Sequence, residues 1–183
     1  MKPIKKDSRI SLKDTQIGNL TNRITFISKA IQRLTKLQII YFANSPFTYD
    51  NIAVDWEDAN SDYAKQYENE ELSWSNLKDL TDVELYNCPN MTQLPDFLYD
   101  LPELQSLNIA CNRGISAAQL KADWTRLADD EDTGPKIQIF YMGYNNLEEF
   151  PASASLQKMV KLGLLDCVHN KVRHLEAFGT NVK

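Results

Sequence analysis

Apolar and polar positions along the chain recur in one nine-residue frame, L-x-x-L-x-L-x-x-N. Apolar residues occupy positions 1, 4 and 6, and Asn, Ser or Cys occupies position 9. The frame occurs as LQIIYFANS from Leu37, LTDVELYNC from Leu80, LQSLNIACN from Leu104, IQIFYMGYN from Ile137 and LGLLDCVHN from Leu162. Apolar residues at positions 4 and 6 are typical of a short strand with one buried face. Their repetition predicts stacked strands that share one core.

The side chain at position 9 is expected to form hydrogen bonds with buried backbone groups at the turn that follows each strand. The last three frames have Asn112, Asn145 and Asn170 there, and the first two have Ser45 and Cys88. An Asn amide donates and accepts, so stacked units can be hydrogen-bonded to one another as a ladder. A buried unpaired amide or carbonyl would cost about 1–3 kcal/mol. Ser and Cys are weaker substitutes for Asn at this position.

These frames resemble leucine-rich repeats over residues 37–178, with a weaker unit at 10–36. The segment LTDVELYNCPNMTQLPDFLYDLPE is similar to repeats that use Cys at position 9. The resemblance implies an α/β solenoid of about five to six repeats. It would be a curved horseshoe with a parallel β-sheet on its concave face and short helices or irregular segments as its outer wall.

Units such as NLTNRITFISKAIQRLTKLQ, together with acidic insertions, are similar to envelope-associated bacterial leucine-rich repeat proteins of unassigned function. That likeness implies an extracytoplasmic or cell-surface location. The basic start MKPIKK is not followed by the apolar segment of a signal peptide. The expected location therefore rests on the resemblance.

The spacing of the frames predicts a single leucine-rich repeat domain over residues 1–183. Residues 1–36 are expected to form a degenerate N-terminal unit, with RISLKDTQI as a candidate first strand and ITFISKAIQRLTKL as a candidate helix or outer wall. Repeat starts near 37, 80, 104, 137 and 162 imply a regular length of about 24 residues. Longer intervals predict insertions near 48–76 and 116–136.

The sequence predicts a helix in the second insertion and further repeats next to the last unit. Ser116 is a candidate N-cap for a helix with Leu120, Trp124 and Leu127 on one face, stopped by Gly134-Pro135. The last unit is apolar, and solenoids need a polar unit over their final edge. We therefore expect a fragment of a longer chain with neighbouring repeats; a dimer through that edge is the alternative.

Charge and cysteine content narrow the classes of partner. A net charge of −5 and an isoelectric point near 5.1 argue against nucleic acid, because no basic stripe is available for phosphates. No apolar run approaches the ~20 residues that span a bilayer, so no membrane insertion is expected. Three cysteines do not form a disulfide framework. We predict that all three are free, although spacing alone leaves a pair open.

The outward positions 3, 5, 7 and 8 of the strands are the candidate binding surface. Interfaces are enriched in Tyr, which offers a large rigid area and a polar tip. The candidate residues are Tyr41, Glu84, Tyr86, Asn108, Tyr141, Tyr144 and Asp166. We interpret them as the concave face of a non-catalytic protein–protein recognition module, aided by the inserted loops. Carbohydrate binding and a rigid spacer in a larger surface protein are the alternatives, and cross-strand packing is the structural explanation of the aromatic residues.

Convergent catalytic groups are not evident in the sequence. Cys167 and His169 resemble a nucleophile and a base, but their frame positions direct them apart. Asp58, Asn60 and Asp62 match the first ligands of a calcium loop, yet Tyr63 replaces the required Gly and the twelfth position is not Glu. We therefore predict no enzyme, no cofactor and no metal, with a loose cation site on the acidic insertion left open.

Overall fold

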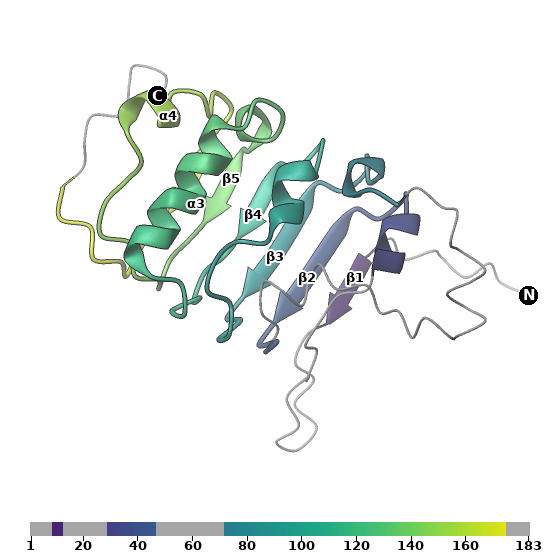
Figure 1. Cartoon of the computed structure of the whole chain (residues 1–183), viewed down its shortest axis with the longest axis horizontal. Coiled ribbons are helices and arrows are strands. Elements are labelled where there is room, and N and C mark those ends of the chain that lie inside the picture. The colour runs from purple at the N-terminus through teal and green to yellow at the C-terminus, as the bar shows by residue number, and fades with distance from the viewer. Residues whose placement is uncertain (1–8, 13–28, 47–71, 175–183) are drawn as a thin grey trace, which may run out of the picture.

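Six short strands form one parallel sheet in chain order (Figure 1). The structure is a computed structural model and describes residues 9–12, 29–46 and 72–174. The strands are β1 (Arg9–Leu12), β2 (Ile39–Ala43), β3 (Asp82–Tyr86), β4 (Ser106–Asn108), β5 (Ile139–Tyr141) and β6 (Leu164–Asp166). Strands β2 to β6 each begin at position 3 of a frame. The predicted parallel sheet is confirmed.

The N-terminal unit contributes a strand and part of the outer wall. β1 lies within RISLKDTQI and pairs with β2, with Arg9 opposite Ile39. The described part of the candidate helix in ITFISKAIQRLTKL contains a 3-10 helix, η1 (Lys29–Arg33). Residues 24–28 of that segment and most of the first insertion lie outside the described residues.

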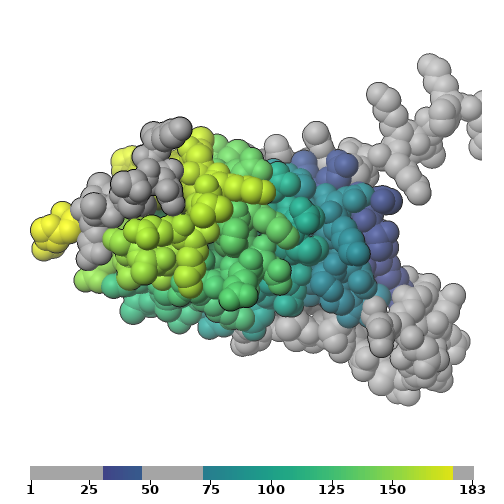
Figure 2. All heavy atoms as spheres, turned by 90° about the horizontal axis from the view of Figure 1, so that it is seen from above, coloured from purple at the N-terminus to yellow at the C-terminus, as the bar shows by residue number. Residues whose placement is uncertain are grey.

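Short helices cover one face of the sheet. They are η1, η2 (Trp74–Asn76), η3 (Asp96–Asp100), α3 (Ala117–Asp129), η4 (Gly134–Lys136) and α4 (Ser153–Leu156). Figure 1 shows α3 lying alongside β5. In Figure 2 the units follow one another along the long axis in sequence order. Each unit therefore packs chiefly on its neighbours, as in other solenoids.

The core lies between the sheet and this outer layer. Frame positions 4 and 6 point into it, and Val83, Leu85, Leu107 and Phe140 have no exposed surface. Fully burying such a side chain contributes about 1.5–3 kcal/mol. At β6 the same positions are only partly buried. The apolar interior is thus continuous from β2 and less covered at β6.

The α3 helix begins where the sequence predicts. The Ser116 hydroxyl accepts a hydrogen bond from Gln119 N at 3.2 Å, which caps the helix. Its predicted apolar face is buried, and the Trp124 ring meets Phe140 edge-on at 5.6 Å between centroids. The helix ends at Asp129, before Gly134. The second insertion is therefore part of the core-covering wall.

A buried carboxylate fastens α3 to the preceding unit. Asp123 accepts hydrogen bonds from Leu94 N at 2.8 Å and from the Gln119 side-chain amide at 2.7 Å. Burial raises the pKa of this carboxyl, while the two hydrogen bonds oppose that rise. The carboxylate thereby satisfies a backbone amide in the neighbouring unit.

The predicted asparagine ladder connects successive units. Asn112 Oδ1 accepts from Cys88 N at 2.7 Å, and its Nδ2 donates to Leu85 O at 2.6 Å and Ile109 O at 2.8 Å. Asn145 Oδ1 accepts in turn from Asn112 N at 2.6 Å. Each amide thus bonds its own turn and the turn of the unit before it.

Candidate functional site

The outward side chains of position 5 form one row across the sheet. The parallel register places each of them directly opposite the next, in the order Tyr41, Glu84, Asn108, Tyr141 and Asp166. All are partly exposed. They lie on the face opposite α3, because strand neighbours alternate between the two faces. We call these residues the position-5 row.

Tyr and carboxylate are adjacent twice in this row. Tyr41 lies opposite Glu84, and Tyr141 lies opposite Asp166. Burial raises the pKa of the Tyr41 phenol, and the nearby Glu84 charge raises it further. The phenol is therefore neutral at pH 7 and can donate a hydrogen bond.

Two members of the position-5 row also support the strand ends. Asn108 Oδ1 accepts from Ala110 N at 3.0 Å. Asp166 Oδ1 accepts from Val168 N at the same distance. Short polar side chains often bond the backbone two residues on in this way. Asn108 and Asp166 thus have a structural role, and Asp166 keeps its second oxygen for other contacts.

Position 8 has a backbone conformation that the sequence analysis missed. In every frame this residue lies in the left-handed region. The φ values are 54° for Asn44, 51° for Asn87, 65° for Cys111, 58° for Tyr144 and 53° for His169. Apart from Gly, the residues enriched in this region are Asn, Asp and His, so Asn44, Asn87 and His169 were the available signal. The last three carry backbone strain of about 1–2 kcal/mol each.

The left-handed turns bring position-8 side chains of neighbouring units together. Asn87 Nδ2 donates to Asn44 Oδ1 at 2.5 Å. At the other end of the sheet the Tyr144 and His169 rings stack with centroids 4.3 Å apart. Tyr144 remains 41% exposed. This stack is cross-strand packing, so the structural explanation accounts for part of the aromatic set.

Tyr86 connects the position-5 row to these turns. The neighbouring Cys111 side chain is the main reason that the pKa of Tyr86 is raised. Tyr41 and Tyr144 lie near enough to raise it slightly as well. All seven predicted surface residues therefore lie on the sheet face or its strand ends, and Cys111 is an addition to them.

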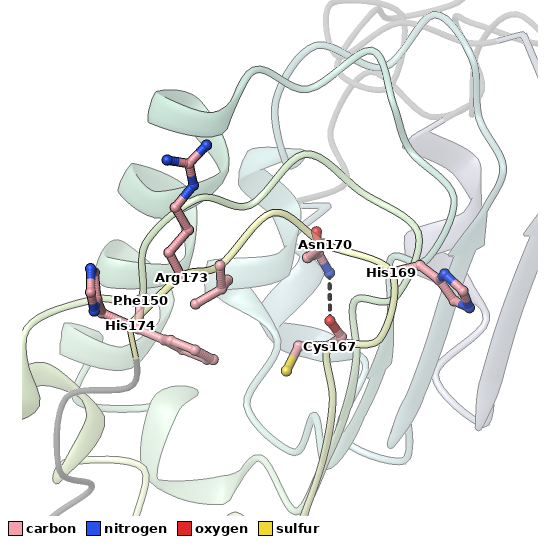
Figure 3. Close-up of a pocket in the computed structure, with 7 residues that line it drawn as sticks. Phe150, Cys167, His169, Asn170, Arg173 and His174 are labelled. Carbon is pink, nitrogen blue, oxygen red and sulfur yellow. Dashed lines mark hydrogen bonds between the residues drawn. The ribbon is translucent and has the colours of Figure 1, made fainter.

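A hollow of about 270 Å³ lies beside β6 (Figure 3). Its lining includes Phe150, Cys167 and Arg173. Figure 3 shows the His169 imidazole pointing away from the Cys167 thiol. Burial raises the pKa of that thiol, followed by the effect of the Asp166 charge. Cys167 is therefore protonated at neutral pH and is not paired with a base.

The structure also bears on the predictions about cysteines, metal ligands and membrane-spanning helices. All three cysteines are free. Within residues 9–12, 29–46 and 72–174, no group of His, Cys, Asp and Glu is arranged to hold a metal ion. Asp58, Asn60 and Asp62 lie outside these ranges. None of the helices in the described part of the chain has the length and apolar character to cross a bilayer.

Comparisons with known proteins relate the chain to other repeat proteins. No protein-family model matches. Toll-like receptor 7 of Drosophila melanogaster is 31% identical over 105 residues, which cover 56% of this chain and 7% of the receptor. A crystallised leucine-rich repeat protein from Bacteroides eggerthii is 62% identical with a TM-score of 0.84. That match covers 100% of this chain and 29% of the Bacteroides protein.

A more distant match concerns the fold alone. An internalin from Listeria monocytogenes has a TM-score of 0.50 at 17% identity, covering 88% of this chain and 38% of the internalin. The chain thus spans a minor part of each of these proteins. The predicted repeat solenoid is confirmed as its fold.

Proposed function

We propose that this chain, which is a leucine-rich repeat protein, is a non-catalytic module that holds a protein partner against the concave face of its sheet. Leucine-rich repeat folds commonly mediate protein–protein interaction. Solenoids do so through extended concave surfaces built from successive units. The proposal for this chain names the position-5 row, with Tyr86 and Tyr144 at its edge.

One observation carries the proposal: four tyrosines are gathered on one partly exposed sheet face. Tyr41, Tyr86 and Tyr141 are half-exposed, and Tyr144 is more exposed. The core lies on the other face, so the fold does not need these rings for burial. Rigid aromatic side chains with polar tips are the residues that protein interfaces use as anchors.

The two inserted segments are proposed to have different roles in partner binding. α3, in the second insertion, packs on the core side of the sheet through Leu120, Trp124 and Leu127. We therefore assign it a supporting role behind the face. The first insertion, near 48–76, is kept as a proposed contributor to partner binding because insertions of repeat proteins often carry recognition.

The first experiment is affinity capture from cell-envelope and host extracts. The wild type is compared with a Tyr41→Ala/Tyr141→Ala variant, which removes two rings from the position-5 row. Tyr41→Phe/Tyr141→Phe is the matched control, because it keeps both rings and loses only the hydroxyls. Circular dichroism of all three proteins checks that the sheet is intact.

A protein retained by wild type and the Phe control, and lost by the Ala variant, supports recognition through this face. Equal capture by all three proteins contradicts it. Glycan binding that requires two of the tyrosines and tolerates deletion of residues 48–71 would instead favour carbohydrate recognition. A function that changes only with the length of the chain would favour the spacer.

A further inference from the structure

Exposed apolar side chains gather at the β5–β6 end of the sheet face. Five large hydrophobic side chains are exposed in the described part of the chain, and three of these, Tyr144, Leu164 and Val168, lie at this end. Ile139 is directly opposite Leu164 in the register of β5 and β6, and it is partly exposed. A contiguous exposed apolar area of this kind is typical of a protein interaction site.

The apolar side chains lie on two sides of a polar centre. Position 3 has Ile139 opposite Leu164, and position 5 has Tyr141 opposite Asp166. Position 7 of the last unit is Val168. Positions 3, 5 and 7 share one face of a strand, with successive side chains about 6.6 Å apart. The order along the strands is therefore apolar, polar, apolar, over about 13 Å.

Val168 continues the strand pairing beyond the end of β6. Tyr144 N donates to Val168 O at 2.8 Å, as Met142 N donates to Asp166 O at 2.7 Å. Position 7 of the β5 unit is Gly143, and a Cβ there would lie 3.1 Å from Val168 Cγ2. The Val168 side chain therefore lies beside Gly143, and Val168 remains 52% exposed.

Asp166 gives the polar centre its charge. It is the single charged residue at positions 3, 5 and 7 of the β4, β5 and β6 units. Its Oδ1 accepts from Val168 N at 3.0 Å, and none of the ion pairs in the described part of the chain includes it. The carboxylate therefore favours a basic group of a partner and disfavours an acidic one.

An extended peptide segment matches this order of positions. In an extended chain, residues i, i+2 and i+4 are on one side, about 6.6 and 13 Å apart. On a helix, residues eight positions apart are about 12 Å apart but about 80° from each other around the axis, so they do not contact one flat face together. A sugar would set hydroxyl groups against Leu164 and Val168, whose side chains form no hydrogen bonds.

We propose that the β5–β6 end of the sheet face binds an extended segment of a protein partner, with apolar residues four positions apart and a basic residue midway between them. One apolar residue contacts Ile139 and Leu164, and the other contacts Val168. The basic residue bonds Asp166 beside the Tyr141 ring. The inference rests on the proposed function, since it specifies the partner chemistry of the same face.

The test uses short fluorescent peptides of Ser and Thr that carry two Leu residues separated by two, four or six positions, with one Arg midway. Binding is measured by fluorescence anisotropy at about 0.15 M ionic strength. The peptide with a separation of four should bind about tenfold more tightly than a peptide with one Leu, because its second side chain also buries apolar area. Gln in place of its Arg should weaken binding several-fold, and Glu should weaken it further.

Variants identify the groups that bind. Leu164→Ser and Val168→Ser should each reduce the affinity for the separation-of-four peptide to that of the single-Leu peptide. Asp166→Asn should remove the preference for Arg over Gln, while its side-chain oxygen can still accept from Val168 N. Leu34→Ser is the matched control, because Leu34 is 47% exposed and follows η1, outside the sheet. It should leave the affinities unchanged.

Two results would overturn the inference. One is affinity that does not depend on the spacing of the Leu residues, and the other is a loss in Leu34→Ser equal to that in Leu164→Ser. If either occurs while Tyr41→Ala/Tyr141→Ala still loses its captured protein, the partner chemistry is wrong and the proposed function stands. If that Ala variant captures the same proteins as wild type, the proposed function itself fails.

Discussion

Replacing Asn112 by Ala tests the hydrogen-bond ladder where it is most deeply buried. The amide accepts from Cys88 N and donates to Leu85 O and Ile109 O. Alanine can make none of these bonds. Because the residue has no exposed surface, water does not readily replace them.

The expected loss of unfolding free energy follows from the backbone groups that lose their hydrogen bond to Asn112. Cys88 N is left as a buried unpaired donor, which costs about 1–3 kcal/mol. Leu85 O loses one bond, worth about 1 kcal/mol. Ile109 O still accepts from Asn145 Nδ2 at 3.0 Å, so its loss is small. The sum is about 3 kcal/mol of unfolding free energy.

Urea unfolding followed by circular dichroism measures this loss. With a slope of about 2 kcal/mol per molar, the midpoint should fall by about 1.5 M. Asn146→Ala is the matched control, because the Asn146 side chain is only half-buried and donates to Arg113 O at a more exposed position. Its expected cost is under about 1 kcal/mol. A changed slope would indicate that units unfold separately.

A second substitution separates bonding from volume. Asn112→Asp keeps an acceptor for Cys88 N but sets a carboxylate against two carbonyl oxygens, so it should destabilise at least as much as Ala at neutral pH. The reasoning is refuted if Asn112→Ala costs no more than the Asn146→Ala control. The ladder would then be a consequence of the fold and not a support for it.

Three further outcomes are expected. Trp124→Ala removes a fully buried ring and should lower the unfolding free energy by about 3–5 kcal/mol in the same urea assay. Tyr144→Asn should relieve left-handed backbone strain of about 1–2 kcal/mol. It also loses the partly exposed ring stack on His169, which is worth the low end of about 0.5–1.5 kcal/mol. The thermal unfolding midpoint should therefore rise, and a fall would contradict the strain. Burial raises the pKa of Asp123 above its ordinary 3.8, so the folded state binds this proton more tightly. Its contribution to stability is therefore fully present below about pH 3.8 and lost as pH rises through the raised pKa. The unfolding free energy of wild type minus that of Asp123→Asn should fall over that window, and a difference independent of pH would refute the shift.

The sequence predicts the parts of the fold that depend on periodic position. Strands begin at position 3 of each frame, and Asn112 and Asn145 bond as the frame implies. The α3 start also follows from local chemistry, since Ser116 caps it. Its end at Asp129 lies before the predicted stop at Gly134-Pro135, which instead begins the 3-10 helix η4.

The surface is predicted less completely than the core. Strand alternation is enough to place Tyr41 and Tyr141 outward. It does not predict the contact of Tyr86 with Cys111 or the stack on His169. Both depend on left-handed backbone at position 8, which residues such as Tyr and Cys do not signal.

The α3 helix also has a consequence for the shape of the face that it does not touch. Strands on the inner side are about 4.8 Å apart, whereas an α-helix with its side chains is about 10 Å wide. A helix of 13 residues between β4 and β5 in the chain, flanked in the wall by the shorter helices η3 and α4, therefore acts as a wedge in the outer wall. Thickening the wall there tightens the bend of the sheet, and shortening the helix would flatten it. Insertion length in this wall thus sets the radius of the surface that a partner must match.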